Sequence, residues 1–184
     1  MIGQRLLDKA AFELMGEARA AGHWIGNHSM NHMIGLGEIP TAEFARDEIE
    51  DAQALIGTLP DQEKLFRPFG QYGHLGPHLF SEQSLLHLCA HDYTTVIWNS
   101  VPRDWADPDG WPEKCLADVA ANDWTVAVLH DIENAAEKRL PEFLTRLKDM
   151  EVAIEQNFPE SVIVTRNRRV VTLASSYVSD RLPA

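Results

Sequence analysis

The 184-residue chain has few cysteines, a shortage of basic residues and no long apolar run. Cys89 and Cys115 are its two cysteines, and no Cys-x-x-Cys spacing occurs, which favours two buried thiols over a disulfide or a zinc knuckle. No stretch approaches the roughly 18 apolar residues that a membrane-spanning helix requires. The net charge of −12, with histidines neutral, argues against nucleic acids and anionic membranes as partners, because both attract basic surfaces.

The composition suits a soluble globular protein. Apolar residues make up 45% of the chain, enough for a sizeable core, and no repeat, low-complexity segment or linker divides it. We therefore predict a single domain over residues 1–184. No signal peptide is visible, since Gln4 and Arg5 precede an amphipathic segment, and this absence slightly favours the cytoplasm. The oligomeric state is not indicated.

Helices and strands are predicted to alternate along the chain. Apolar spacings of three to four residues predict helices over residues 6–18, 42–56, 77–90, 111–122 and 136–156. Short β-branched, aromatic or apolar runs predict strands over residues 23–26, 65–67, 93–98, 124–129, 161–165 and 170–173. Thr41 is the expected cap of the second helix, residues 124–129 are expected to be covered on both faces, and the tail from Ser175 is expected to be loose. This alternation predicts an α/β fold with a mainly parallel sheet or barrel.

The stretch Gly26-Asn27-His28-Ser29-Met30-Asn31-His32 is the most informative part of the sequence. Two imidazoles four residues apart, His28 and His32, can reach one metal ion if the backbone between them turns helical. The same spacing also occurs in ordinary surface histidine pairs, and no third protein ligand is evident. The stretch alone therefore leaves both interpretations open.

Three further motifs follow in order. They are Phe66-Arg67-Pro68-Phe69-Gly70, Arg103-Asp104-Trp105 and Val128-Leu129-His130-Asp131. We expect each to lie where a strand ends and a loop begins. In a β/α barrel these strand ends form the active-site face, so the motifs are predicted to converge in space.

This ordered set of motifs resembles the NodB-type polysaccharide deacetylases of carbohydrate esterase family 4, from Met1 to about Leu173. The resemblance implies a distorted (β/α) barrel that removes N-acetyl groups from an acetylated polysaccharide or oligosaccharide. It also implies that His28 and His32 hold zinc or another divalent metal, which acts as a Lewis acid.

The resemblance assigns a role to each remaining motif residue. Arg67 would orient the catalytic carboxylate, and a backbone N–H of Phe69 or Gly70 would help to bind the oxyanion. Asp104 would accept a hydrogen bond from His130, the general acid that protonates the leaving amine. Two residues would contact the substrate: Trp105 along the sugar and Leu129 at the acetyl methyl group.

One family motif is absent from the sequence. The family begins with Phe-Asp-Asp-Gly, whose aspartates supply the general base and the third metal ligand, and this motif does not occur here. Because Met1-Ile2-Gly3 resembles the end of the family's second strand, we expect the domain to be truncated at its N-terminus and to lack its first strand. Asp131 lies on the wrong strand to replace the base.

Two alternatives remain open for the function. The chain could be an inactive or glycan-binding remnant, or it could hydrolyse a non-sugar amide on the same fold.

His87 and His91 share one face of a predicted helix, but no glutamate follows His87 as in the His-Glu-x-x-His motif. We interpret this pair as structural.

Overall fold

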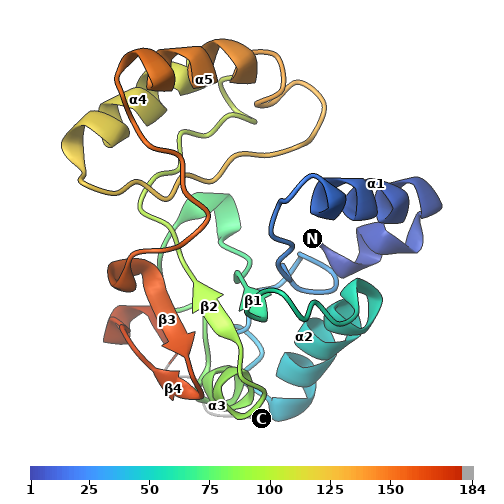
Figure 1. Ribbon diagram of the computed structural model, residues 1–184. Coiled ribbons are helices and arrows are strands. Elements are labelled where there is room, and N and C mark those ends of the chain that lie inside the picture. The colour runs from blue at the N-terminus through green and yellow to red at the C-terminus, as the bar shows by residue number, and fades with distance from the viewer. Residues whose placement is uncertain (180–184) are drawn as a thin grey trace. The chain divides into compact units, whose positions relative to one another are not determined.

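The computed structural model describes residues 1–179 and divides the chain into two compact units (Figure 1). The first unit comprises Met1–Ile97 and the segment that begins at Ile163, and the second comprises Trp98–Val162. Within the described residues, every helix is too short or too polar to cross a membrane.

Short helices make up most of the regular structure. The first unit contains η1 (Gly3–Leu7), α1 (Lys9–Ala20), α2 (Ala42–Ile56), η2 (Gln71–Gly73), α3 (Glu82–Ala90) and η4 (Ser175–Tyr177), where η denotes a 3-10 helix. The second unit contains α4 (Trp111–Ala121), α5 (Leu140–Asp149) and η3 (Glu160–Val162). Helical structure is present in all five predicted segments, and α2 alone has the predicted bounds.

Capping explains where the helices begin. Thr41 caps α2 as predicted, because its side chain accepts a hydrogen bond of 3.2 Å from the backbone N–H of Phe44. Asp8 instead divides the first predicted helix, since its carboxylate caps α1 after η1 has ended. The third predicted helix starts late, at the capping box that Ser81 forms with Ser84.

A four-stranded sheet lies in the first unit, with the order β1 (Leu65–Phe66), β2 (Thr94–Val96), β3 (Ile163–Arg166) and β4 (Arg169–Val170) (Figure 1). β1 and β2 are parallel, whereas β2–β3 and β3–β4 are antiparallel. The α/β fold is therefore confirmed, but the prediction of a mainly parallel sheet is wrong. β4 returns directly along β3 because Asn167 and Arg168 both adopt positive φ, at 53° and 62°, as a tight hairpin turn requires. The distorted barrel stays a prediction.

Two predicted strands are not strands in the structure. Residues 124–129 form one isolated parallel bridge, between Ser100 and Ala127, and Trp124 is 39% exposed. The expectation that both faces of this run are covered is therefore wrong. In residues 23–26, the backbone N–H and carbonyl of Ile25 pair with the side chain of Gln62 rather than with a neighbouring strand.

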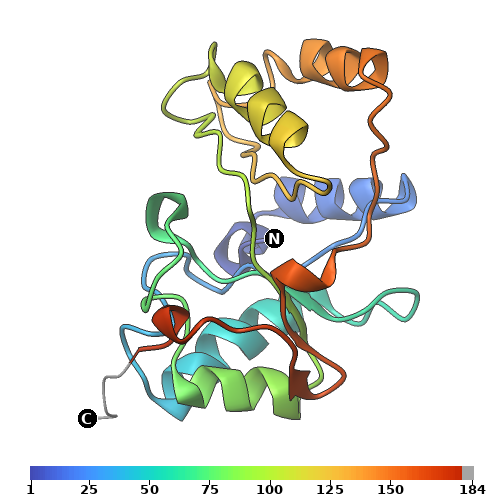
Figure 2. The same ribbon diagram turned by 90° about the vertical axis from the view of Figure 1, so that its left-hand side faces the viewer.

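The core of the first unit lies between its sheet and its helices. Phe66 and Tyr93 are fully buried, with ring centroids 6.2 Å apart, and α2 packs beside α3 (Figure 2). The backbone of Phe80 bonds to Tyr177 and Ser179 at 3.2 and 2.8 Å. The expectation of a loose tail is thus wrong as far as Ser179, and its remainder lies outside the described residues.

The second unit has its own smaller core. Trp111 of α4 packs on Phe143 of α5 with ring centroids 4.8 Å apart, and the two helices lie side by side (Figure 1). Cys115, Leu116, Ala136 and Leu147 complete this cluster. The unit therefore positions its loops on a packed helix pair rather than on a sheet.

Candidate functional site

The histidine motif and Arg67 lie side by side in the first unit. The backbone N–H of Asn27 donates to Leu65, and the N–H of Arg67 donates to Asn27, both at 2.9 Å. These bonds form an isolated parallel bridge between Asn27 and Phe66 of β1. The ends of two neighbouring extended segments thus bring His28 and Arg67 together, as the sequence predicted for these two motifs.

His28 has the protonation state that a metal ligand requires. Its Nδ1 lies 2.7 Å from the backbone oxygen of Arg67, and because a carbonyl oxygen can only accept, Nδ1 must donate. Nε2 of the neutral ring then carries a free lone pair. Burial, reinforced by the nearby charge of Arg67, holds the pKa of His28 well below its usual value. His28 is therefore neutral at physiological pH.

The ring of His32 lies against that of His28, although the backbone between them forms no helical turn. Ser29 and His32 both adopt left-handed backbone conformations, with φ of 65° and 56°, and the Ser29 hydroxyl accepts the N–H of His32 at 3.2 Å. The two imidazole centroids are 4.6 Å apart, and the ring of Phe69 lies 4.4 Å from His32. Left-handed backbone at non-glycine residues is costly and occurs often at functional sites.

Two asparagines anchor this loop on α2, and sequence reasoning missed both. Asn27 donates to the carbonyl oxygen of Ile49 at 2.8 Å and accepts the N–H of Ser29 at 3.0 Å. Asn31 bonds to buried Glu48 through its backbone N–H at 3.1 Å and its side chain at 2.6 Å. The available signal was Glu48 itself, a charged residue on the otherwise apolar face of an amphipathic helix.

Arg67 remains a cation in its partly buried position. Burial lowers the pKa of its guanidinium to about 10, which leaves it charged at neutral pH. Gly70 is buried and Phe69 is half-buried on the loop that follows. Their predicted roles, in orienting a carboxylate and binding an oxyanion, stay predictions.

Asp104 and His130 form a close pair in the second unit. Asp104 is fully buried, and its Oδ1 lies 2.8 Å from Nδ1 of His130. Its Oδ2 accepts the backbone N–H of His130 at 2.7 Å. Nδ1 is thereby the donor, and Nε2 is left for proton exchange on a side chain that is 30% exposed.

The two predicted substrate-binding residues of this unit have different surroundings. The ring of Trp105 meets that of His130 edge-on, with centroids 4.7 Å apart. Leu129 packs against the core cluster around Trp111 and Phe143. The structure therefore brings Asp104, Trp105 and His130 together, whereas the side chain of Leu129 contributes to the core.

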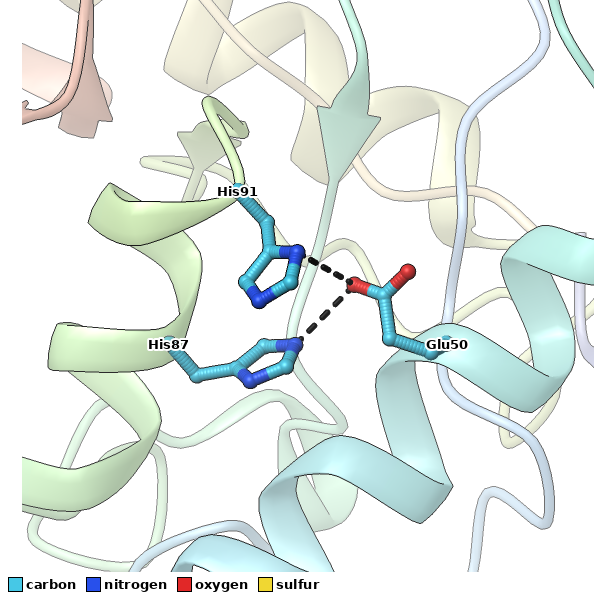
Figure 3. Close-up of side chains that lie close together, drawn as sticks. All are labelled: Glu50, His87 and His91. Carbon is cyan, nitrogen blue, oxygen red and sulfur yellow. Dashed lines mark hydrogen bonds and ion pairs between the residues drawn. The ribbon is translucent and has the colours of Figure 1, made fainter.

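A group of three potential metal ligands lies elsewhere in the first unit. Among residues 1–179, no imidazole, thiolate or carboxylate joins His28 and His32 to form a group of three whose ligand atoms lie within 4.8 Å of one another. Glu50, His87 and His91 do form such a trio, in which the Glu50 carboxylate faces both imidazoles (Figure 3). Sequence reasoning found the histidines but missed Glu50, because that residue comes from another helix.

Comparison with known proteins supports the resemblance that the motifs suggested. No family model matches the chain. A curated relative, the peptidoglycan-N-acetylglucosamine deacetylase of Bacillus cereus, is 31% identical over 97 residues, which are 52% of this chain and 41% of that protein. The chain thus spans less than half the length of this relative.

Solved structures share the fold. A polysaccharide deacetylase from Bacillus cereus matches with a TM-score of 0.67 and 24% identity, over 91% of this chain and 84% of that one. A carbohydrate esterase family 4 pseudoenzyme from Bacillus anthracis matches with a TM-score of 0.66 and 17% identity, over 82% of this chain and 50% of that one. Both structures have the α/β fold of this chain.

The chain has an α/β fold and carries the ordered motifs described above. The resemblance to the polysaccharide deacetylases of carbohydrate esterase family 4 is confirmed. Among these relatives are deacetylases and a pseudoenzyme, so the fold by itself does not assign an activity.

Proposed function

We propose that this protein hydrolyses N-acetyl groups of an acetylated polysaccharide or oligosaccharide, on a distorted (β/α) barrel that uses a divalent metal. The observation that carries the proposal is the 2.7 Å hydrogen bond between His28 Nδ1 and the Arg67 carbonyl oxygen. That bond leaves Nε2 free in the tautomer that binds metals.

The donor set of the first unit fits such a metal. The imidazoles of His28, which is neutral, and His32 are ligand types that suit zinc and similar ions, and we propose them as two of its ligands. When bound, the metal would supply Lewis-acid chemistry, which polarises the acetyl carbonyl and activates water. The carbonyl of Arg67 would orient the His28 ring, as outer hydrogen-bond partners do in metal sites.

His130 is the proposed general acid. Amide hydrolysis releases an amine that leaves poorly unless its nitrogen is protonated, and a positioned imidazole can deliver that proton. Asp104 holds Nδ1 of His130 at 2.8 Å, so the proton would leave from Nε2. The buried carboxylate would also stabilise the imidazolium before it transfers the proton.

The other motif residues have proposed supporting roles. Arg67 would orient the carboxylate that acts as base, and the backbone N–H of Phe69 or Gly70 would bind the oxyanion. Trp105, beside His130, would contact the sugar. Leu129 packs against the core cluster, and the part of its side chain outside that contact would face the acetyl methyl group. The general base is not assigned to a residue of the printed sequence, which contains no Phe-Asp-Asp-Gly motif.

That missing motif favours a second candidate, a protein that binds acetylated glycans without hydrolysing them. The two candidates share the motif residues and differ only in whether acetate is released. A third outcome, hydrolysis of a non-sugar amide, would use the same residues on a different substrate.

Acetate release decides between these functions. We would express the full reading frame, load it with zinc, and incubate it with N-acetylglucosamine oligomers, peptidoglycan and a cyclic ureide. The proposal predicts acetate from at least one glycan and its loss in His130→Gln. Glycan binding without acetate would favour the second candidate. Ring opening of the ureide to its carbamoyl acid, without acetate from any glycan, would favour the third.

A further inference from the structure

We propose that Glu50, His87 and His91 form a second divalent-metal site in the first unit, with different ligands from the pair His28 and His32. The site would take zinc or a similar ion, with an open position for water. This inference does not depend on the proposed deacetylase activity. It replaces the purely structural interpretation of His87 and His91 that the sequence suggested.

The ligand atoms already lie close to the separations that a metal requires. Oε1 of Glu50 is 3.0 Å from Nε2 of His87 and 3.9 Å from Nδ1 of His91, and all three ligand atoms lie within 4.8 Å of one another (Figure 3). Tetrahedral zinc with bonds of about 2.0–2.1 Å separates its ligands by about 3.3 Å. Metal binding would require the His87 Nε2 proton that now bonds Glu50 to move to Nδ1 or to solvent, and small side-chain rotations would then complete the geometry.

Two packed helices hold the three ligands in place. His87 lies in the last turn of α3, and His91 is its C-terminal cap residue, so the four-residue spacing puts both rings on one face. The rings stack with centroids 4.2 Å apart and planes 19° from parallel. Glu50 reaches them from α2, which packs against α3. A bound ion would link the two helices.

The three side chains of the trio differ in solvent exposure, and this leaves the site accessible from one side. The side chain of His87 is 12% exposed, that of Glu50 31% and that of His91 50%. The two less exposed ligands would be oriented by packing, while His91 leaves one side open to solvent. Two histidines and one glutamate with an open position for water are a known ligand set of zinc sites.

Tyr93 supplies the outer hydrogen bond that ligating carboxylates usually have. Its hydroxyl donates to Oε1 of Glu50 at 2.9 Å, and the residue is fully buried. Burial and the Glu50 charge raise the pKa of the Tyr93 phenol, so it remains a donor. Although burial alone would raise the pKa of Glu50, hydrogen bonds from His87 and Tyr93 bring it below its usual value. The carboxylate is therefore ionised at neutral pH.

One nearby charge opposes cation binding. The ammonium group of Lys64 lies 4.1 Å from the Tyr93 ring centroid and also helps to keep Glu50 ionised. Its repulsion would weaken the site, whereas direct bonds from two imidazoles and a carboxylate would outweigh a single half-buried lysine. Lys64→Met is therefore expected to tighten metal binding.

The test measures metal binding directly. Cobalt(II) is titrated into a His28→Ala/His32→Ala variant of the full chain, and its visible d–d absorption reports tetrahedral or five-coordinate binding. We expect one equivalent to bind, with zinc displacing it. Glu50→Gln and His91→Asn should each weaken binding at least about 100-fold, and His23→Asn, which removes an exposed histidine outside the trio, should leave it unchanged.

Two further measurements guard against misfolding. His91 is half-exposed, so His91→Asn should keep the far-ultraviolet circular dichroism of its parent even if Glu50→Gln does not. In the chain that keeps His28 and His32, His91→Asn should remove one equivalent of bound cobalt. It should also make the rise in Tm on adding zinc smaller than in the parent chain. Equal cobalt binding with and without His91 would overturn the proposal, as would no binding by the folded double variant.

Discussion

Both carboxylate oxygens of Asp104 contact His130: Oδ2 accepts its backbone N–H at 2.7 Å, and Oδ1 lies 2.8 Å from its Nδ1. A single buried side chain therefore fixes both the position of the His130 backbone and the orientation of its ring. This double contact makes Asp104 a positioning residue for the proposed general acid.

Asp104→Asn should lower kcat for acetate release by about 100- to 10,000-fold, because the amide cannot support the imidazolium that general-acid catalysis requires. KM should change little. Asp131→Asn is the matched control, since Asp131 is exposed and adjacent to the same histidine. A kcat that survives Asp104→Asn would contradict the assignment.

His32→Ala should weaken zinc binding at the His28 pair by at least about 100-fold, because one of two proposed protein ligands is lost. Competition with a chromophoric chelator measures this affinity, in a His91→Asn background that removes the second proposed site. His23→Ala again serves as the control. Unchanged affinity in His32→Ala would show that this residue is not a ligand.

Asn27→Ala should destabilise the first unit by about 1–3 kcal/mol, because its side chain is buried and satisfies two backbone groups. Denaturant unfolding measures the change in free energy. Asn122→Ala removes an amide that bonds the Asp118 carbonyl at an exposed position, and it should cost much less. Equal effects of the two substitutions would argue against the anchoring role of Asn27.

The two thiols should react slowly with Ellman's reagent at neutral pH. Burial raises the pKa of both Cys89 and Cys115, which lowers their thiolate fractions. Cys115 is 1% exposed and should react last, at least about 10-fold more slowly than a free thiol. Labelling of Cys89→Ala identifies which kinetic phase of the reaction belongs to which thiol. In denaturant, both thiols should react rapidly. Rapid labelling of Cys115 in the native protein would contradict this account.

Local patterns predicted the parts of the fold that local interactions determine. The periodicity of α2 and its Thr41 cap, the position of α4, and the adjacency of the His28 and Arg67 motifs were all accessible from the sequence. Each depends on helix capping, on amphipathic spacing, or on the tendency of polar motifs to follow strands.

Those local patterns do not predict which distant segments of the chain pair with each other. An apolar run such as residues 124–129 does not reveal whether a neighbouring strand exists, and here the run forms an isolated bridge to Ser100 instead of a strand. The direction of β3 depends on where the chain returns after the second unit, which periodicity does not encode. Glu50 reaches His87 only because α2 packs against α3, so the trio could not be found from spacing alone.

The most direct test of the central claim is acetate release from N-acetylglucosamine oligomers, measured on the full reading frame before metal removal, after chelation and after zinc is restored. The account predicts that chelation abolishes release, that zinc restores it, and that His28→Ala/His32→Ala shows none at any stage. Release that persists undiminished after chelation, or in the double variant, would contradict a metal-dependent deacetylase at this site.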